Sequence, residues 1–236
     1  MEMNDRLKEF DIESKKARIE KARRVCFGAF SRLYNSTFEK DLFPDISNPL
    51  RTYAERYVCE WTHNKTNGHS LFMYGATGIG KSFYGACITN ALLEKDSSNL
   101  YCDLKVLYCF MPSLEWSTSE ERNAVLEKVK ASDFVFVDEL DATAIPRNAI
   151  NFYFTFFNTL YERSIPFVLT TNASPESMFA DKQNDVRFAK IYDRISHQCA
   201  KYGFVTNKFS IRTELAKRER EEYLKSIEQD KTPSTP

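Results

Sequence analysis

Gly75-Ala76-Thr77-Gly78-Ile79-Gly80-Lys81-Ser82 is the stretch that decides the fold of this 236-residue chain. It fits the pattern G-x-x-x-x-G-K-[ST], and three of the chain's seven glycines lie inside it. Glycines at these positions let the backbone adopt conformations that other residues avoid, so that successive N–H groups turn inward around an anion. The stretch therefore predicts a phosphate-binding loop (P-loop), with Thr77, Gly78 and Ile79 supplying N–H groups.

The sequence on either side of the loop supports this interpretation. Leu71-Phe72-Met73-Tyr74 is a short apolar run that stops at a glycine, as a buried strand does, and a helix is expected at 81–95. A strand before the loop and a helix after it are the context in which this pattern binds nucleotide phosphates, with the helix dipole directed at the anion. We expect Lys81 to reach the β- and γ-phosphates and the Ser82 hydroxyl to ligate Mg²⁺.

A second motif joins an apolar strand to two acids. Asp133-Phe134-Val135-Phe136-Val137-Asp138 resembles a buried strand, and Glu139 follows it. Burying a strand that ends in acids is costly unless a cation or hydrogen-bond donors await them. We therefore expect Asp138 to hold Mg²⁺ through water, and Glu139 to orient and activate an attacking water molecule.

A third apolar run, Phe167-Val168-Leu169-Thr170-Thr171-Asn172, ends in an amide. In a parallel sheet its end lies at the same edge as the phosphate loop, where ligands of such sheets bind. Asn172 is expected there to hydrogen-bond the γ-phosphate or the attacking water. A turn-forming asparagine that ends the strand is the simpler alternative.

Two arginines late in the chain, Arg194 and Arg212, complete the candidate site. A guanidinium that reaches a neighbouring subunit's nucleotide can neutralise charge in the transition state. Most arginines on helices are only solvated, so their position in the sequence does not decide between these roles.

Strand and helix patterns alternate along the chain, which predicts an α/β fold with a parallel sheet covered by helices on both faces. Further strands are expected at 105–111 and 204–209. Helices are expected at 49–61, where Asn48-Pro49 provides the cap, and at 118–131, 147–164, 183–200 and 213–228. Residues 63–70 read as a polar linker.

Composition is that of an ordinary globular protein. Hydrophobic residues make up 42% and charged residues 28%, and Lys plus Arg balances Asp plus Glu at 33 each, so net charge indicates neither a nucleic-acid nor a membrane partner. The sequence has no apolar run of membrane-spanning length and no secretion signal, and a cytoplasmic location is expected. Cys87, Cys102 and Cys109 lie in apolar contexts typical of core cysteines. Cys59, His63 and His69 match no standard zinc spacing.

The first 30 residues are polar and helix-prone, with a basic run at 15–24. Such a run is either a solvated helix face or a contact surface for a partner or DNA.

Together these motifs resemble the AAA+ ATPases of the bacterial replicative helicase loader group, the DnaC and DnaI type, and the related IstB transposition helpers. Besides the loop and its strand, the matching stretches are Phe136-Val137-Asp138-Glu139-Leu140, Leu169-Thr170-Thr171-Asn172, Tyr192-Asp193-Arg194-Ile195 and Phe209-Ser210-Ile211-Arg212. The resemblance covers about residues 36–213. It implies an AAA+ ATPase domain over 36–213 with a reduced or absent C-terminal lid, an N-terminal basic helical segment at 1–35 for partner docking, and a charged helix and tail at 214–236.

By that resemblance Asn172 is the sensor 1 residue, Arg194 the arginine finger and Arg212 a candidate sensor 2 arginine, with ATP and Mg²⁺ as cofactors. Three departures limit the transfer. Ile211 replaces the usual aromatic residue. Residues 112–133 are short where cellular loaders carry an extra helix for single-stranded DNA, and the chain has no cysteine cluster of the DnaI type.

The resemblance implies a loader that docks on a hexameric replicative helicase, as a homo-oligomer or an oligomer templated by the helicase, with single-stranded DNA as a further ligand. Hydrolysis would be slow and regulatory. Two alternatives stay open: an IstB-like, ATP-dependent DNA-binding transposition helper, which the neutral charge disfavours, and an interaction protein that binds ATP but barely hydrolyses it.

Overall fold

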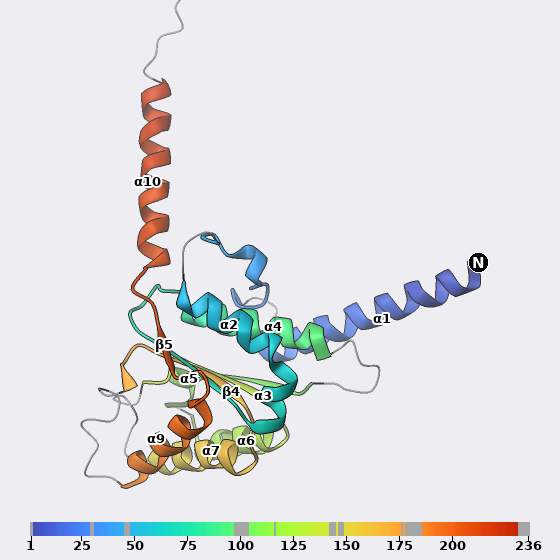
Figure 1. Cartoon of the computed structure of the whole chain (residues 1–236), viewed down its shortest axis with the longest axis vertical. Helices are drawn as coiled ribbons and strands as arrows, with labels where there is room; N and C mark the ends of the chain where they lie inside the picture. The colour runs from blue at the N-terminus through green and yellow to red at the C-terminus, as the bar shows by residue number, and fades with distance from the viewer. Residues whose placement is uncertain are drawn as a thin grey trace, which may run out of the picture.

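Five parallel strands form one sheet in the order β2-β3-β4-β1-β5 (Figure 1). The computed structural model describes residues 2–28, 31–44, 48–96, 104–115, 117–141, 145, 149–175, 177 and 186–230. The strands are β1 (Leu71–Tyr74), β2 (Val106–Phe110), β3 (Phe134–Asp138), β4 (Phe167–Thr171) and β5 (Phe204–Thr206). The expected α/β fold with a parallel sheet is confirmed.

Helices cover both faces of the sheet (Figure 1). On one face lie α2 (Pro49–Cys59), α4 (Lys81–Asp96) and the end of α1 (Glu2–Phe27), and on the other lie α6 (Ser119–Lys130), α7 (Ile150–Glu162) and α9 (Val186–Cys199). The short elements are η1 (Phe38–Lys40), α3 (Trp61–Asn67) and α5 (Met111–Glu115). After β5, the described chain continues through a short link into α10 (Ile211–Asp230).

The central strands are apolar throughout because both of their faces are buried. In β3, Phe134 and Phe136 face the layer of α2 and α4, while Val135 and Val137 face the layer of α7 and α9. In the layer of α2 and α4, α4 packs very close to β3. A Cβ on Gly85 of α4 would lie 2.4 Å from the Phe136 ring, so only glycine lets the helix sit this close to the strand.

The segment expected as a polar linker is mostly helix, and that expectation was wrong. The expected helix at 49–61 ends at Cys59, and α3 carries the chain on to Asn67. Trp61 is buried and Asn64 donates to the Tyr57 carbonyl at 3.0 Å, while the polar residues between them face outward. One apolar anchor in seven residues gives too weak a periodic signal to reveal such a helix.

Other boundaries moved by a few residues. The strand expected at 105–111 ends at Phe110, because α5 begins at Met111, and the strand expected at 204–209 ends at Thr206. Asn48 caps α2 as expected, and its side chain accepts from the Leu50 N–H at 3.0 Å. Cys87 and Cys109 are buried as expected. Cys102, the expected helix starts at 147 and 183 and the tail at 231–236 lie outside the described residues.

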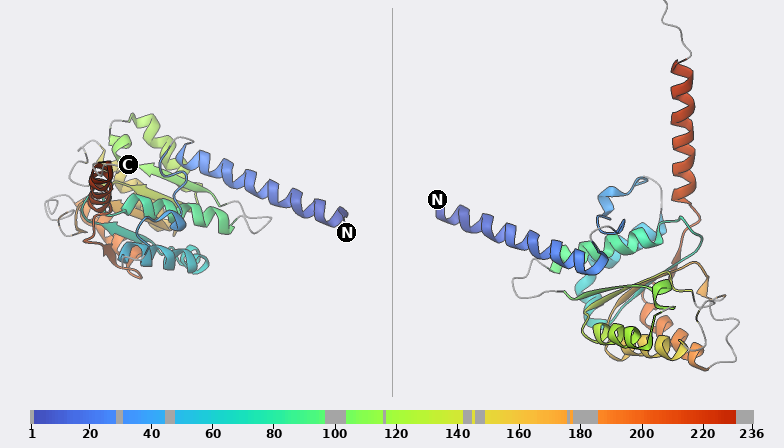
Figure 2. Two further views of the ribbon diagram at one scale, coloured as in Figure 1. Left: turned by 90° about the horizontal axis from the view of Figure 1, so that it is seen from above. Right: turned by 180° about the vertical axis from the view of Figure 1, so that it is seen from behind.

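Two long helices project from the body (Figure 2). In α1, the buried residues between 12 and 27 are Cys26 and Phe27, and Arg23 pairs with Glu94 of α4. Part of the basic run is thus paired within the chain, since Arg24 also binds Glu20 at 3.2 Å, whereas Lys16 and Lys21 are exposed. No helix among the described residues is both long enough and apolar enough to cross a membrane.

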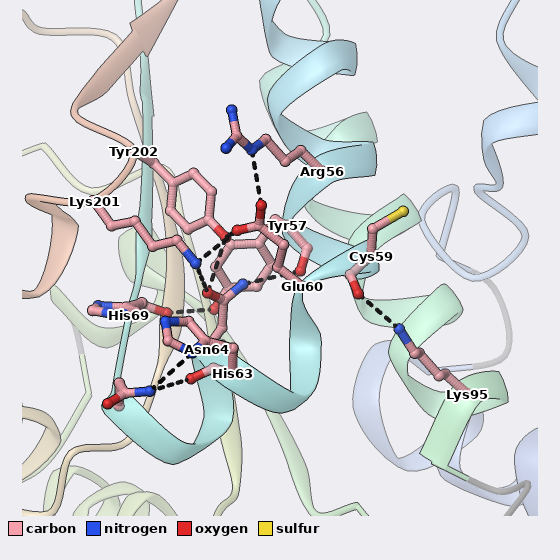
Figure 3. A network of polar contacts seen from close by, with 11 residues as sticks. Arg56, Tyr57, Cys59, Glu60, His63, Asn64, His69, Lys95, Lys201 and Tyr202 are labelled. Carbon is pink, nitrogen blue, oxygen red and sulfur yellow. Dashed lines mark hydrogen bonds and ion pairs between the residues drawn. The ribbon is translucent and has the colours of Figure 1, made fainter.

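An ionic network fixes the corner between α2 and α3 to the turn before β5 (Figure 3). The Glu60 carboxylate binds Lys201 Nζ at 2.6 Å and Arg56 Nε at 2.9 Å, and accepts from the Tyr202 hydroxyl at 2.9 Å. Lys201 contributes most, ahead of Arg56 and Tyr202, to lowering the pKa of Glu60 from 4.5 to about 2.

We expect Glu60→Gln to lower the stability of the protein in a pH-dependent way. The pKa of Glu60 is depressed in the folded state, so its contribution is full above pH 4.5 and is lost as the pH falls toward 2. Urea unfolding of the native and variant chains at pH values between 7 and 3 measures this. The gap between their free energies of unfolding should narrow below pH 4.5, and a constant gap would contradict the assignment.

Candidate functional site

The loop between β1 and α4 has the backbone that its glycines predict. Gly75, Gly78 and Gly80 have φ values of 121°, 91° and 97°, in the region that residues with a Cβ rarely adopt. The side chain of Ile79, which lies within this loop, is 1% exposed and belongs to the core. Its expected role concerned only the backbone N–H.

Lys81 connects the loop to the end of β4. It is buried, and its Nζ donates to the carbonyls of Gly75 at 2.7 Å and Ala76 at 2.9 Å and to Asn172 Oδ1 at 2.9 Å. Burial lowers the pKa of Lys81, and the charges of Glu139 and Asp138 oppose that effect. The structure thus brings together the loop lysine and the strand-end amide, 91 positions apart in the sequence.

Asp138 ends β3 as a buried carboxylate, 3% exposed. Its Oδ1 accepts from Ser82 Oγ at 2.8 Å and Thr170 Oγ1 at 2.6 Å, and its Oδ2 accepts from the Tyr108 hydroxyl at 3.1 Å. Ser82 and Asp138, the two expected metal-side residues, are therefore in direct contact. A hydroxyl and a carboxylate side by side are the hard oxygen ligands that Mg²⁺ prefers, so these residues fit a magnesium ion.

Glu139 has a left-handed backbone, with φ 56°, which is uncommon for a residue other than glycine. Thr170 of β4 supports this turn, because its Oγ1 accepts from the Glu139 N–H at 2.9 Å while donating to Asp138. One threonine thus positions both acids. Sequence reasoning missed it, although a hydroxyl inside an apolar strand that ends beside acids was a usable signal.

Lys81, Ser82, Glu139 and Asn172 line a cavity of about 340 Å³, within the range of small-molecule sites, whereas Asp138 and Thr170 lie behind its lining. Its lining includes the expected residues Thr77, Gly78, Gly80, Lys81, Ser82, Glu139, Asn172 and Arg212. It also includes residues that the sequence did not indicate: Lys40, Asp41, Leu42, Phe83, Thr171, Ile211 and Leu215.

The segment around η1 forms the outer wall of this cavity. Two contacts hold the Asp41 side chain in place. Its Oδ2 accepts from the Tyr84 hydroxyl at 2.8 Å and pairs with Arg51 at 3.0 Å. Leu42, which is 61% exposed, lines the cavity together with apolar residues of the first turns of α10, Ile211 and Leu215. One cavity is therefore lined both by polar groups of the loop and strand ends and by apolar side chains of the segment near η1 and of α10.

Comparison with known families identifies the domain to which these residues belong. A family model described as the bacterial DnaA ATPase domain matches residues 34–190, more than half of the chain. The chain belongs to the bacterial DnaA ATPase domain family. Within the AAA+ proteins it is DnaI/DnaC-like, as the sequence motifs led us to expect, whereas the match to DnaA was not anticipated.

Individual relatives agree with this assignment. The replicative helicase loader DnaI of Bacillus subtilis (strain 168) is 28% identical over 182 residues, 71% of this chain and 56% of that protein, so the chain spans about half the length of this relative. Among solved structures, the DnaC helicase loader matches with a TM-score of 0.59 at 16% identity, over 75% of this chain and 99% of that one. AMPPCP-bound DnaA from Aquifex aeolicus matches with a TM-score of 0.56 at 17% identity, over 80% and 55%. At 16% and 17% identity, these two solved structures show a similar fold and nothing further.

The two candidate arginines of this DnaA-family domain lie in different places. Arg212, at the start of α10, lines the cavity, and its N–H donates to the Gly78 carbonyl at 3.3 Å. Arg194 lies on α9, where its Nε donates to Asn158 Oδ1 at 2.9 Å and its guanidinium lies over the rings of Phe154 and Tyr161. It does not line the chain's own cavity, so its role toward a neighbouring subunit stays a prediction.

Cys59, His63 and His69 do not form a metal site in the described structure. The rings of His63 and His69 lie 5.3 Å apart between centroids, and Cys59 is exposed on the preceding helix (Figure 3). Among the described residues no group of three or more histidine, cysteine or acidic side chains could hold a metal ion.

We expect Thr170→Val to destabilise the protein by about 1–3 kcal/mol, because the Glu139 N–H and a buried Asp138 oxygen each lose a partner. Urea unfolding measures the change. Thr89→Val is the matched control: Thr89 is also fully buried, but its hydroxyl bonds only to the Gly85 carbonyl of its own helix, at 2.9 Å. Equal losses in the two variants would show that Thr170 has no special part in holding the acids.

Proposed function

We propose that this chain binds Mg·ATP in the cavity at the carboxyl ends of β1, β3 and β4, and hydrolyses it slowly. The convergence of Lys81, Ser82 and Asn172 on one cavity carries the proposal, together with the hydrogen bond from Ser82 to the buried Asp138. They come from the start of α4 and the ends of β3 and β4, and a purely structural role would not require them to meet.

Each residue has a distinct task in this proposal. The loop N–H groups and Lys81 bind the phosphates, and Ser82 with Asp138 holds the metal ion. Bound magnesium would neutralise charge that develops on the phosphoryl oxygens. Glu139 orients the attacking water and takes its proton, while Asn172 and Arg212 contact the γ-phosphate.

The outer wall of the cavity suits the base. Leu42, Ile211 and Leu215 offer apolar surface to a planar ring. The segment near η1 also contacts α10 directly, because the guanidinium carbon of Arg218 lies 4.2 Å from the centroid of the Phe43 ring.

We expect Glu139→Gln to bind ATP as tightly as the native chain and to hydrolyse it about 10²-fold more slowly, because it loses its general base. Phosphate release and a nucleotide-binding titration measure the two properties. Glu127→Gln, the same change at an exposed glutamate, is the control, and Lys81→Ala should lose binding itself. Equal hydrolysis rates for Glu139→Gln and the native chain would favour an interaction protein that binds ATP without real catalysis.

We further propose that the domain acts in replication initiation as a helicase loader, an adaptor that ATP switches between states. The similarity to the loader DnaI supports this proposal. Helix α1, which projects from the body with exposed lysines, is the proposed docking element for a hexameric replicative helicase. Arg194 would then act between subunits of a homo-oligomer or helicase-templated assembly. The IstB-like transposition helper, which would bind duplex DNA with ATP, remains the alternative.

Mixing the protein with its host's replicative helicase tests the loader proposal. We expect a complex whose mass by light scattering differs between ATP and ADP, and Lys81→Ala should abolish that difference because it no longer senses nucleotide. No complex in any nucleotide state would overturn the loader proposal. Binding of duplex DNA with ATP would then favour the transposition helper.

A further inference from the structure

The metal-side carboxylate is held from a direction that the phosphate loop does not reach. Ser82 and Thr170 both donate to Oδ1 of Asp138, while Oδ2 accepts from Tyr108 of β2 at 3.1 Å. Strand β2 pairs with β3, and Phe110, two residues beyond Tyr108, is the register partner of Asp138. The tyrosine hydroxyl therefore reaches diagonally across the sheet to the acid.

The Tyr108 ring has little freedom to swing away from this contact. Its centroid lies 5.3 Å from that of Phe136 on β3, and the Phe136 ring in turn rests against the backbone of Gly85 on α4. The Phe27 ring packs against Tyr108 as well, with 5.3 Å between the two ring centroids.

Phe27 belongs to the last turn of α1, the helix that projects from the body (Figure 2). Within the described part of that helix, Cys26 and Phe27 are buried, and they form its seat on the body near β2 and α4. The N-terminal part of the helix projects away from the body (Figure 2). The Phe27 ring thus lies between the projecting helix and the tyrosine that holds Asp138.

We propose that Tyr108 is a positioning residue for the metal-side carboxylate, and that its contact with Phe27 couples the seat of α1 to the magnesium-dependent part of nucleotide binding. This inference rests on the proposed function of the cavity. It assigns roles to two residues, on β2 and α1, that lie outside the nucleotide motifs. A change in how α1 sits on the body would move the Tyr108 ring and so alter the support of Asp138.

Removing one hydroxyl tests the first step. The affinity of a non-hydrolysable ATP analogue is measured by calorimetry with excess Mg²⁺ and with EDTA, and the ratio of the two dissociation constants gives the gain due to metal. Tyr108→Phe keeps the ring and its packing but loses the donor to Asp138. We expect it to lower that gain about 10-fold, the usual effect of losing a group that orients a metal ligand. The affinity in EDTA should stay within about twofold, because the phosphate loop is unchanged.

Tyr57→Phe is the matched control. Tyr57 packs on the same side of the sheet and is fully buried, whereas Tyr108 is half-buried; the Tyr57 hydroxyl donates to the His69 carbonyl at 2.9 Å, before β1 and away from the cavity. It should lose stability by urea unfolding and keep the full gain due to metal. An unchanged gain in Tyr108→Phe, or equal losses in both variants, would overturn the positioning role.

Phe27→Leu tests the link to α1. We expect it to lower the gain due to metal about 2- to 10-fold, in the same direction as Tyr108→Phe, since the ring loses its support on one side. Phe152→Leu, a change at a similarly buried phenylalanine in the opposite layer, should leave the gain unaltered. If Phe27→Leu behaves like Phe152→Leu, the coupling is overturned. If the native chain binds no nucleotide in either buffer, the proposed function fails; normal binding with unchanged gains overturns only this inference.

Discussion

A buried carboxylate is the constraint on which the site depends. Asp138 is 3% exposed at the end of a strand that is apolar on both faces, and hydroxyls from Ser82, Thr170 and Tyr108 satisfy its oxygens. A buried charge without such donors would destabilise the whole sheet. The three hydroxyls come from α4, β4 and β2, so satisfying one side chain requires the loop helix and both strands beside β3 to be in register.

The sequence was informative where the chemistry is local. Short local patterns were enough to predict the loop after β1, the two acids at the end of β3 and the amide after β4. Because the carboxyl ends of parallel strands meet at one edge of a sheet, these residues were expected to lie together, and they do. Arg212, for which the local match was weakest, lies in the cavity, whereas Arg194 packs on α7.

What the sequence could not give are contacts between distant segments. Tyr108 and Asp138 are 30 positions apart, and Asp41 and Tyr84 are 43 apart, with no periodicity that links them. The helix α3 was missed because it buries little besides Trp61. The division of the chain at residues 35 and 213 stays a prediction, although α1 and α10 do project from the body as such a division implies.

The strand order also has a consequence for how the protein comes to exist. Strand β1, which leads into the phosphate loop, pairs on one side with β4 through Leu71 and Val168 and on the other with β5 through Phe72 and Phe204. Both partners are synthesised long after β1 itself. Sheets built from such distant pairings fold slowly, because the chain must close large loops before the pairing is rewarded. During synthesis, β1 therefore has no native strand partner until β4 has left the ribosome, and it has both partners only after β5 follows.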